Sequence, residues 1–143
     1  MVSILVDTGV WLALCDPREQ TVTRKVVDEI YERVRVHSIV VPWPIAYETL
    51  RTRFVRNRHA MERFEREIRS PRVVLLDDAP YREEALALSI ESSLRRDRPL
   101  SMVDCTLRLL IDDVRTRIRY LVTFNQRDFA DVCARHQIEL WSR

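Results

Sequence analysis

The chain has 143 residues, of which 46% are hydrophobic and 32% charged, and its net charge is +2. This length and apolar content suit one globular domain, expected over residues 1–143, and argue against a disordered chain. No apolar stretch reaches the length of a membrane span, and no basic segment with a cleavage site opens the chain. We therefore expect a soluble, cytoplasmic protein that does not act in a membrane.

The cysteines are too few and too scattered to organise the fold. Cys15, Cys105 and Cys133 are odd in number and lack C-x-x-C spacing. A disulfide framework and a zinc site are both disfavoured by this pattern. Buried free thiols are the expectation.

Arginine dominates the basic residues, because Lys25 is the only lysine among 24 of them. A coding bias and a selection for phosphate contacts explain this equally well. The local clustering is more informative. Between residues 51 and 69 the acids are only Glu62, Glu65 and Glu67, and the arginines are Arg51, Arg53, Arg56, Arg58, Arg63, Arg66 and Arg69. Such a stripe suits contacts to a nucleic-acid backbone, although each arginine alone fits a solvated helix face as well.

The first half of the chain alternates short apolar runs with helical patterns. Strands are predicted at Ile4–Val6 and Ile39–Val41, and helices over Val10–Leu14, from Thr21 or Thr23 to Tyr31 or Val34, from Pro44 onward, and over His59–Arg69. In the helix from Pro44, the predicted buried stripe is Tyr47, Leu50 and Phe54, with Glu48 on the flank.

The second half repeats this alternation. Strands are predicted at Val73–Leu76, Ile118–Phe124 and Ile138–Trp141, and helices over Tyr81–Leu94, from Ser101 onward, and over Asp128–Arg135. The predicted buried stripe of the Ser101 helix is Val103, Leu107, Leu110 and Val114. Strands that alternate with helices predict an α/β fold with a mainly parallel central sheet of about five strands covered by helices on both faces, a three-layer α/β/α arrangement.

Four acidic residues stand where an apolar run ends or a helix begins. They are Asp7, Glu48, Asp104 and Asp128. Ligands of an open parallel sheet collect outside the carboxyl ends of its strands, so these acids can meet although they are far apart in sequence. Converging carboxylates repel one another, and a hard divalent cation such as Mg²⁺ relieves the repulsion. The pattern favours a metal-dependent enzyme of phosphoryl transfer or phosphodiester cleavage.

Each of these acids also has a structural interpretation. Asp7 can cap a short helix, Asp104 can complete a capping box with Ser101, and Asp128 can cap in the same way. Glu48 can be a surface partner for Arg51 or Thr52. Taken singly, each structural role is the simpler one, but independent caps have no reason to fall at the same end of one sheet.

Other acidic phosphoryl-transfer sites do not match the chain. A haloacid-dehalogenase-like phosphatase has a second aspartate two residues after the first, where this chain has Gly9. A response-regulator receiver needs a lysine late in the chain, and the only lysine is Lys25. A single glycine excludes a glycine-rich phosphate loop.

The matching segments resemble the PIN domain family, especially the VapC-type toxin ribonucleases. Ile4–Gly9 looks like the opening of such a domain, and Tyr47–Glu48, Leu100–Cys105 and Leu121–Phe129 match the remaining motifs in order. The resemblance runs from residue 4 to about residue 141. It implies a parallel sheet flanked by helices, one or two Mg²⁺ or Mn²⁺ ions, and endonucleolytic cleavage of RNA.

The resemblance also assigns roles by position. Asp7 and Asp104 are expected as the principal metal ligands, with Glu48 and Asp128 completing the catalytic set directly or through water. Asn125 stands where one common form of the family has an acid, so either Asn125 or Asp128 is the fourth site residue.

The remaining expectations concern support and partners. The supporting hydroxyls are expected to be those of Thr8 and Thr123, and the arginines that hold RNA are expected to be Arg51, Arg53, Arg56 and Arg58. The resemblance implies a cognate antitoxin protein and a homodimer. Two alternatives stay open: an RNA-processing or DNA-acting nuclease without an antitoxin, and a PIN-like scaffold that holds RNA or protein without cleaving.

Overall fold

A five-stranded parallel sheet forms the centre of the protein. The computed structural model describes residues 2–19, 22–96 and 98–141. The strands are β1 (Ser3–Val6), β2 (Ser38–Pro42), β3 (Val73–Leu76), β4 (Ile118–Val122) and β5 (Glu139–Trp141). Their order in the sheet is β3-β2-β1-β4-β5, and every neighbouring pair is parallel. The predicted α/β fold with a parallel sheet is confirmed.

The strand order reverses at β1. From β1 the chain builds outward through β2 to β3, and it then returns to the other side of β1 for β4 and β5. The carboxyl ends of β1 and β4 therefore mark the switch point of the sheet, which is where open α/β sheets bind their ligands.

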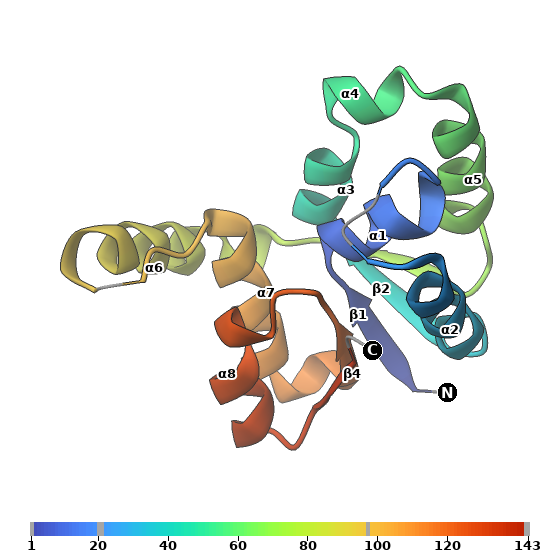
Figure 1. Cartoon of the computed structure of the whole chain (residues 1–143). Helices are drawn as coiled ribbons and strands as arrows, with labels where there is room; N and C mark the ends of the chain where they lie inside the picture. Colours follow the sequence, from blue (N-terminus) through green and yellow to red (C-terminus); the bar gives the residue numbers. More distant parts are fainter. Residues whose placement is uncertain (1, 20–21, 97, 142–143) are drawn as a thin grey trace.

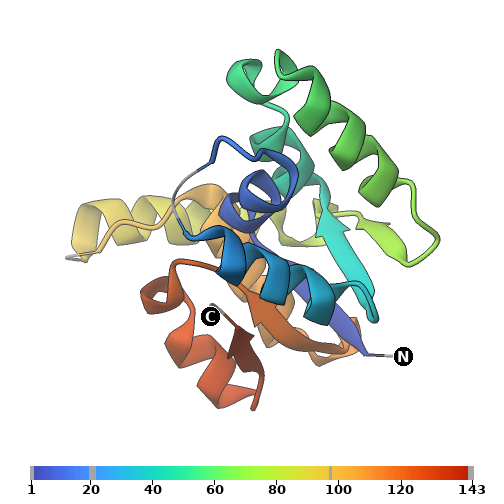
Figure 2. The same cartoon turned by 45° about the vertical axis from the view of Figure 1, so that its right-hand side comes forward.

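Helices cover both faces of this sheet. They are α1 (Thr8–Cys15), α2 (Arg24–Val34), α3 (Trp43–Thr49), α4 (Thr52–Val55), α5 (Arg58–Ile68), α6 (Arg82–Arg95), α7 (Met102–Asp112) and α8 (Ala130–Arg135). Helices α1, α2 and α5 lie on one side, and α7 and α8 lie on the other (Figures 1 and 2). Helix α6 packs against α7 and projects away from the sheet (Figure 1).

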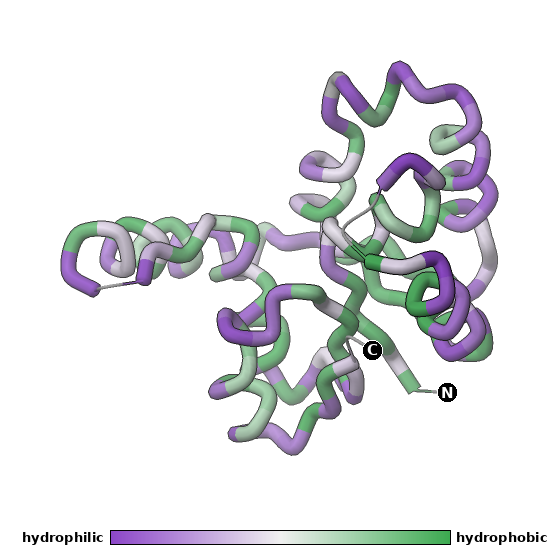
Figure 3. Tube along the Cα trace, viewed as in Figure 1, coloured by the Kyte–Doolittle hydropathy of each residue, from purple (hydrophilic) through white to green (hydrophobic). Residues whose placement is uncertain are grey.

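The central strand is apolar from Ile4 to Val6 because both of its faces are covered there. Ile4, Leu5 and Val6 are completely buried, whereas Val74 and Leu75 on the edge strand β3 are exposed. Hydrophobic residues accordingly follow the sheet, and hydrophilic ones gather on the outer helices (Figure 3). The predicted buried thiols are confirmed, since all three cysteines are free and buried.

The predicted boundaries are close to the observed ones, and most differ by one or two residues. Helix α2 is capped by Thr23, whose side chain accepts a hydrogen bond from the backbone N–H of Val26. The alternative start at Thr21 lies outside the described residues. No helix in the described part of the chain is long and apolar enough to cross a membrane.

The predicted buried stripe of the helix from Pro44 is wrong in two of its three residues. Tyr47 is 76% exposed and Leu50 is also exposed, while Phe54 is buried as predicted. The helix breaks at Leu50 (φ −83°, ψ 47°), which separates α3 from α4. The residues of α3 that face inward are Ile45, Ala46 and Thr49. Entry from the buried strand β2 sets this face, and the break then turns Phe54 back onto Phe64, with ring centroids 5.9 Å apart.

The end of the Ser101 helix was also predicted wrongly. Helix α7 stops at Asp112, so Val114 lies beyond it and is 75% exposed. Asp113 leaves the helix, and its carboxylate accepts hydrogen bonds from the Tyr81 hydroxyl (2.7 Å) and the backbone N–H of Arg115 (3.0 Å). These local bonds replace another helical turn.

Leu107 and Val114 differ in their expected contribution to stability. Leu107 is completely buried, so Leu107→Ala should lower the free energy of unfolding by about 2–5 kcal/mol in urea denaturation. Val114→Ala, at the exposed position, should change it by less than about 0.5 kcal/mol. Similar losses for the two variants would contradict the observed end of α7.

Candidate active site

Asp7 is held at the switch point by backbone and side-chain hydrogen bonds. It follows β1 directly and caps α1, where its Oδ1 accepts from the backbone N–H of Thr8 at 2.8 Å. Its own backbone N–H donates to the carbonyl oxygen of Val122 in β4 at 3.0 Å. The capping role therefore exists, and it leaves the carboxylate at the carboxyl end of the sheet.

Thr123 joins Asp7 to the segment after β4. Its buried hydroxyl donates to Asp7 Oδ2 at 2.9 Å and accepts from the backbone N–H of Asn125 at 3.0 Å. Thr8 is buried as well, and its Oγ1 has no hydrogen-bond partner among the described residues. Thr123 thus orients the carboxylate across the two strands that flank the switch point.

Asp104 lies in the first turn of α7. Ser101 caps this helix, since its Oγ accepts from the backbone N–H of Asp104 at 3.1 Å. Among the described residues, no hydrogen bond from the Ser101 backbone N–H to the Asp104 carboxylate is observed, although the Ser101 side chain interacts with that carboxylate. The carboxylate of Asp104 is not needed to cap the helix.

The four acids influence one another electrostatically. Burial, and to a smaller extent the charges of Asp7, Asp128 and Glu48, raises the pKa of Asp104 to about 6, against a side-chain hydrogen bond from Ser101 that lowers it. Burial also raises the pKa of Asp7 above its usual value, against hydrogen bonds from Thr123 and Thr8, and the charges of Glu48 and Asp128 add to the rise. Carboxylates from four separate segments are therefore gathered within electrostatic reach of one another.

Glu48 approaches this group from α3, which contacts both α1 and α7. Its flank position was predicted, and its side chain is only partly exposed. The predicted surface pairing is present too: Arg51 Nη2 lies 4.0 Å from Glu48 Oε1, and Arg51 Nε donates to the Glu48 carbonyl oxygen at 2.8 Å.

Asp128 lies in the segment after β4, and its carboxylate has two donors. Asn125 Nδ2 donates to Oδ2, and Arg98 Nη2 forms an ion pair with Oδ1. Arg108 of α7 secures the same segment, because its Nη1 donates to the Asp128 carbonyl oxygen at 2.7 Å while its two terminal nitrogens bind Asp131. Asn125 and Asp128 are thus joined by a hydrogen bond in this segment.

Arg98 is the residue of this group that the sequence analysis missed. It lies in the segment between α6 and α7, three residues before the cap residue Ser101. Its position just ahead of the helix that contains Asp104 was the available signal. No periodicity marks an ion pair between residues 98 and 128.

The four arginines predicted to hold RNA fall into two groups. Arg51 and Arg53 line a pocket of about 220 Å³ together with Glu48. Arg58 instead pairs with Glu62 within α5 at 3.0 Å, and Arg56 is exposed. The structure therefore brings Arg51 and Arg53 to Glu48, one of the four acids, whereas Arg58 occupies a solvated helix face.

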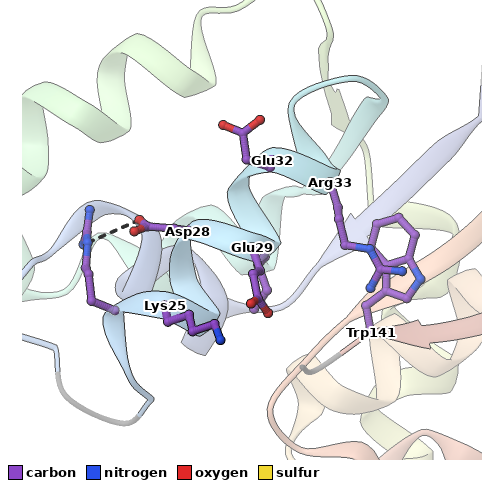
Figure 4. Close-up of a pocket in the computed structure, with 8 residues that line it drawn as sticks. Lys25, Asp28, Glu29, Glu32, Arg33 and Trp141 are labelled. Carbon is purple, nitrogen blue, oxygen red and sulfur yellow. Dashed lines mark ion pairs between the residues drawn. The ribbon is translucent and has the colours of Figure 1, made fainter.

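A more spacious pocket of about 800 Å³ lies along α2 and does not include the four acids (Figure 4). Its wall contains an ion pair between Arg24 and Asp28 and the guanidinium of Arg33, which stacks 4.2 Å from the ring centroid of Trp141. Its charged residues are of both signs and belong mainly to one helix. The acidic group at the switch point is the stronger candidate for chemistry.

The acidic group fits a hard divalent cation in its chemistry. Its donors are carboxylate oxygens, which Mg²⁺ and Mn²⁺ prefer, and the pKa values of Asp7 and Asp104 are raised by burial and by neighbouring carboxylates. In the described part of the chain, no three acidic, histidine or cysteine side chains are close enough to hold one ion together. The side chains present thus have the right donor chemistry without forming a closed cage.

Removal of the Asp104 charge should stabilise the metal-free protein. Because the pKa of Asp104 is raised from 3.8 to about 6, the protonated carboxyl group adds to the free energy of unfolding at low pH. This contribution is lost as the pH rises through 6. Asp104→Asn should therefore raise the melting temperature by a few degrees at pH 7.5 in EDTA and have little effect near pH 4. Ser101→Ala, the control, should cost about 1 kcal/mol at both pH values. A lower melting temperature of Asp104→Asn at both would show a capping role instead.

The comparisons with known proteins agree with this geometry. Residues 4–135 match the PIN domain, a range that runs from β1 into α8 and includes all four acids. A comparison with curated proteins finds no match. PIN domains are generally nucleases, which hydrolyse nucleic acid. With most of its length matched, this chain belongs to the PIN domain family.

Proposed function

We propose that the protein is a divalent-metal-dependent endoribonuclease and the toxin of a toxin–antitoxin pair. The observation that supports the nuclease activity best is the group of four carboxylates at the switch point, in which burial and neighbouring negative charge raise the pKa of Asp7 and of Asp104. A protein gains no stability from such repulsion. Binding of a cation and of a substrate phosphate explains why these carboxylates lie together.

In this proposal Asp7 and Asp104 hold Mg²⁺, or Mn²⁺ in its place. The bound ion would lower the pKa of a water molecule and stabilise charge on the phosphate oxygens. Thr123 fixes the orientation of the Asp7 carboxylate through its hydroxyl. Glu48 orients the attacking water, and Asp128 with Asn125 completes the rim of the site.

RNA is held by the arginines beside the acids. Arg51 and Arg53 share a pocket with Glu48, so their guanidinium groups can bind backbone phosphates next to the cleaved bond. Products with 5′-phosphate and 3′-hydroxyl ends are expected. The same arginine-rich surface, from α3 to α5, is the expected docking surface for an antitoxin protein, and a homodimer is the expected assembly.

Loss of one inner carboxylate should remove most of the cleavage. Asp7→Asn should lower the rate on a labelled RNA panel by at least about 100-fold, the scale of removing one charged catalytic group. EDTA should have the same effect on the wild type. Glu139→Gln, which removes an exposed acid on β5, is the control and should retain full activity. Cleavage that persists in Asp7→Asn or in EDTA would refute the proposal, and cleavage of matched DNA alone would change the substrate.

Thr123 should act on the metal rather than on the fold alone. Thr123→Val keeps the volume but removes the hydrogen bond to Asp7, so the Mg²⁺ requirement or the cleavage rate should worsen about 10–100-fold. Thr106→Val is a matched control, because Thr106 is also buried and, within the described residues, its hydroxyl donates only to the Met102 carbonyl oxygen in α7. An equal effect of the two changes on a Mg²⁺ titration would assign Thr123 a purely structural role.

A further inference from the structure

Arg98 and Asp128 form an ion pair in which the aspartate is mostly buried and the arginine is more exposed to solvent. The side chain of Asp128 is 13% exposed and that of Arg98 is 41% exposed. The pair joins the segment before α7 to the segment after β4, so it spans the two segments that bring Asp104 and Asp128 to the site. The guanidinium is thereby held at the edge of the acidic group without being covered.

Asp128 differs from the inner acids in how its oxygens are used. Both of its carboxylate oxygens already have donors, from Arg98 and from Asn125. Among the described residues, Asp7 and Asp104 have no cationic partner. The outer acids are paired with arginines and the inner acids are not, so a cation from solution is needed only by the inner pair.

We propose that Arg98 binds an RNA phosphate beside the cleaved bond, and that Asp128 acts through Arg98 as a positioning residue rather than as a metal ligand. This inference rests on the proposed ribonuclease function. A guanidinium has five N–H donors, and the bond to Asp128 Oδ1 occupies only part of them. The remaining donors can bind phosphate oxygens in the bidentate way that arginine favours.

The position of Arg98 also meets an electrostatic need. Four carboxylates repel an RNA backbone, and a metal ion offsets only part of their charge. Arg51 beside Glu48 and Arg98 beside Asp128 place a positive charge at each of the two outer acids. The substrate phosphates thus meet positive charge at the rim while the inner acids stay available for the metal.

The test compares two arginines of the same segment. Arg98→Ala is compared with Arg96→Ala, because Arg96 has the same charge but pairs with Glu91 of α6 instead of the acidic group. Binding of a labelled single-stranded RNA is measured by anisotropy over a range of salt, in the Asp104→Asn background so that cleavage does not interfere. Arg98→Ala should weaken binding about tenfold and reduce the slope of log K against log salt by about 0.7, the loss of one phosphate contact. Arg96→Ala should change both far less.

A double-mutant cycle tests the role of Asp128. If Asp128 acts through Arg98, Asp128→Asn combined with Arg98→Ala should bind RNA no more weakly than Arg98→Ala alone. In the otherwise wild-type protein, Asp128→Asn should leave the Mg²⁺ concentration for half-maximal cleavage unchanged, and Arg98→Lys should recover part of the binding.

Three results would overturn the inference. One is RNA binding that Arg98→Ala does not weaken more than Arg96→Ala. Another is cleavage by Arg98→Ala at lower Mg²⁺ than the wild type needs, which would make Arg98 a tethered cation that competes with the metal. The third is a higher Mg²⁺ requirement in Asp128→Asn, as expected of a ligand. If the wild type binds RNA without cleaving it, the nuclease proposal is refuted. The comparison of RNA binding by Arg98→Ala and Arg96→Ala still decides whether Arg98 binds RNA.

Discussion

Repulsion among the four carboxylates is the constraint to which the rest of the structure responds. Burial and neighbouring negative charge raise the pKa of Asp7 and of Asp104, so the folded protein holds these groups at a cost. Bringing them together requires compensation elsewhere. The sheet supplies it, since Ile4, Leu5 and Val6 of its central strand are completely buried and the strand pairs with a neighbour on each side.

The compensation near the site comes from a few hydrogen-bond donors and arginines beside three of the four acids. Thr123 and the backbone of Thr8 bind Asp7, Asn125 and Arg98 bind Asp128, and Arg51 lies beside Glu48. Asp104 has no arginine beside it among the described residues, and burial together with neighbouring negative charge raises its pKa to about 6. The site thus concentrates its unfavourable charge on the two innermost groups, where a cation gives the largest relief.

Much of the fold could be predicted because its signals are local. The apolar run Ile4–Val6 before Asp7 marks a buried strand, and Ser101 marks the start of α7. The prediction that Tyr47 and Leu50 are buried failed for a tertiary reason. The way the chain enters α3 from β2 sets which face of this helix points inward, and this overrides the expected stripe. Arg98 escaped prediction for a related reason: an ion pair between two loop segments leaves no periodic trace. The four acids were found because each follows a local landmark, whereas their mutual distances depend on packing.

The break at Leu50 has a consequence for how the site can adapt. Asp7 and Asp128 are tied to one frame, through Thr123 and Asn125, and Arg108 joins that frame to the helix of Asp104. Glu48 belongs to a helix of seven residues that ends in the break and is held to α1 and α7 by side-chain packing. Asp7, Asp104 and Asp128 therefore belong to segments joined by hydrogen bonds, whereas Glu48 is joined to them through the packing of its helix. A short rigid-body shift of α3 would change the distance between Glu48 and the other three acids without breaking a hydrogen bond among their segments. A larger or smaller bound ion, or a different path of the RNA strand, would therefore be accommodated by movement of Glu48 alone.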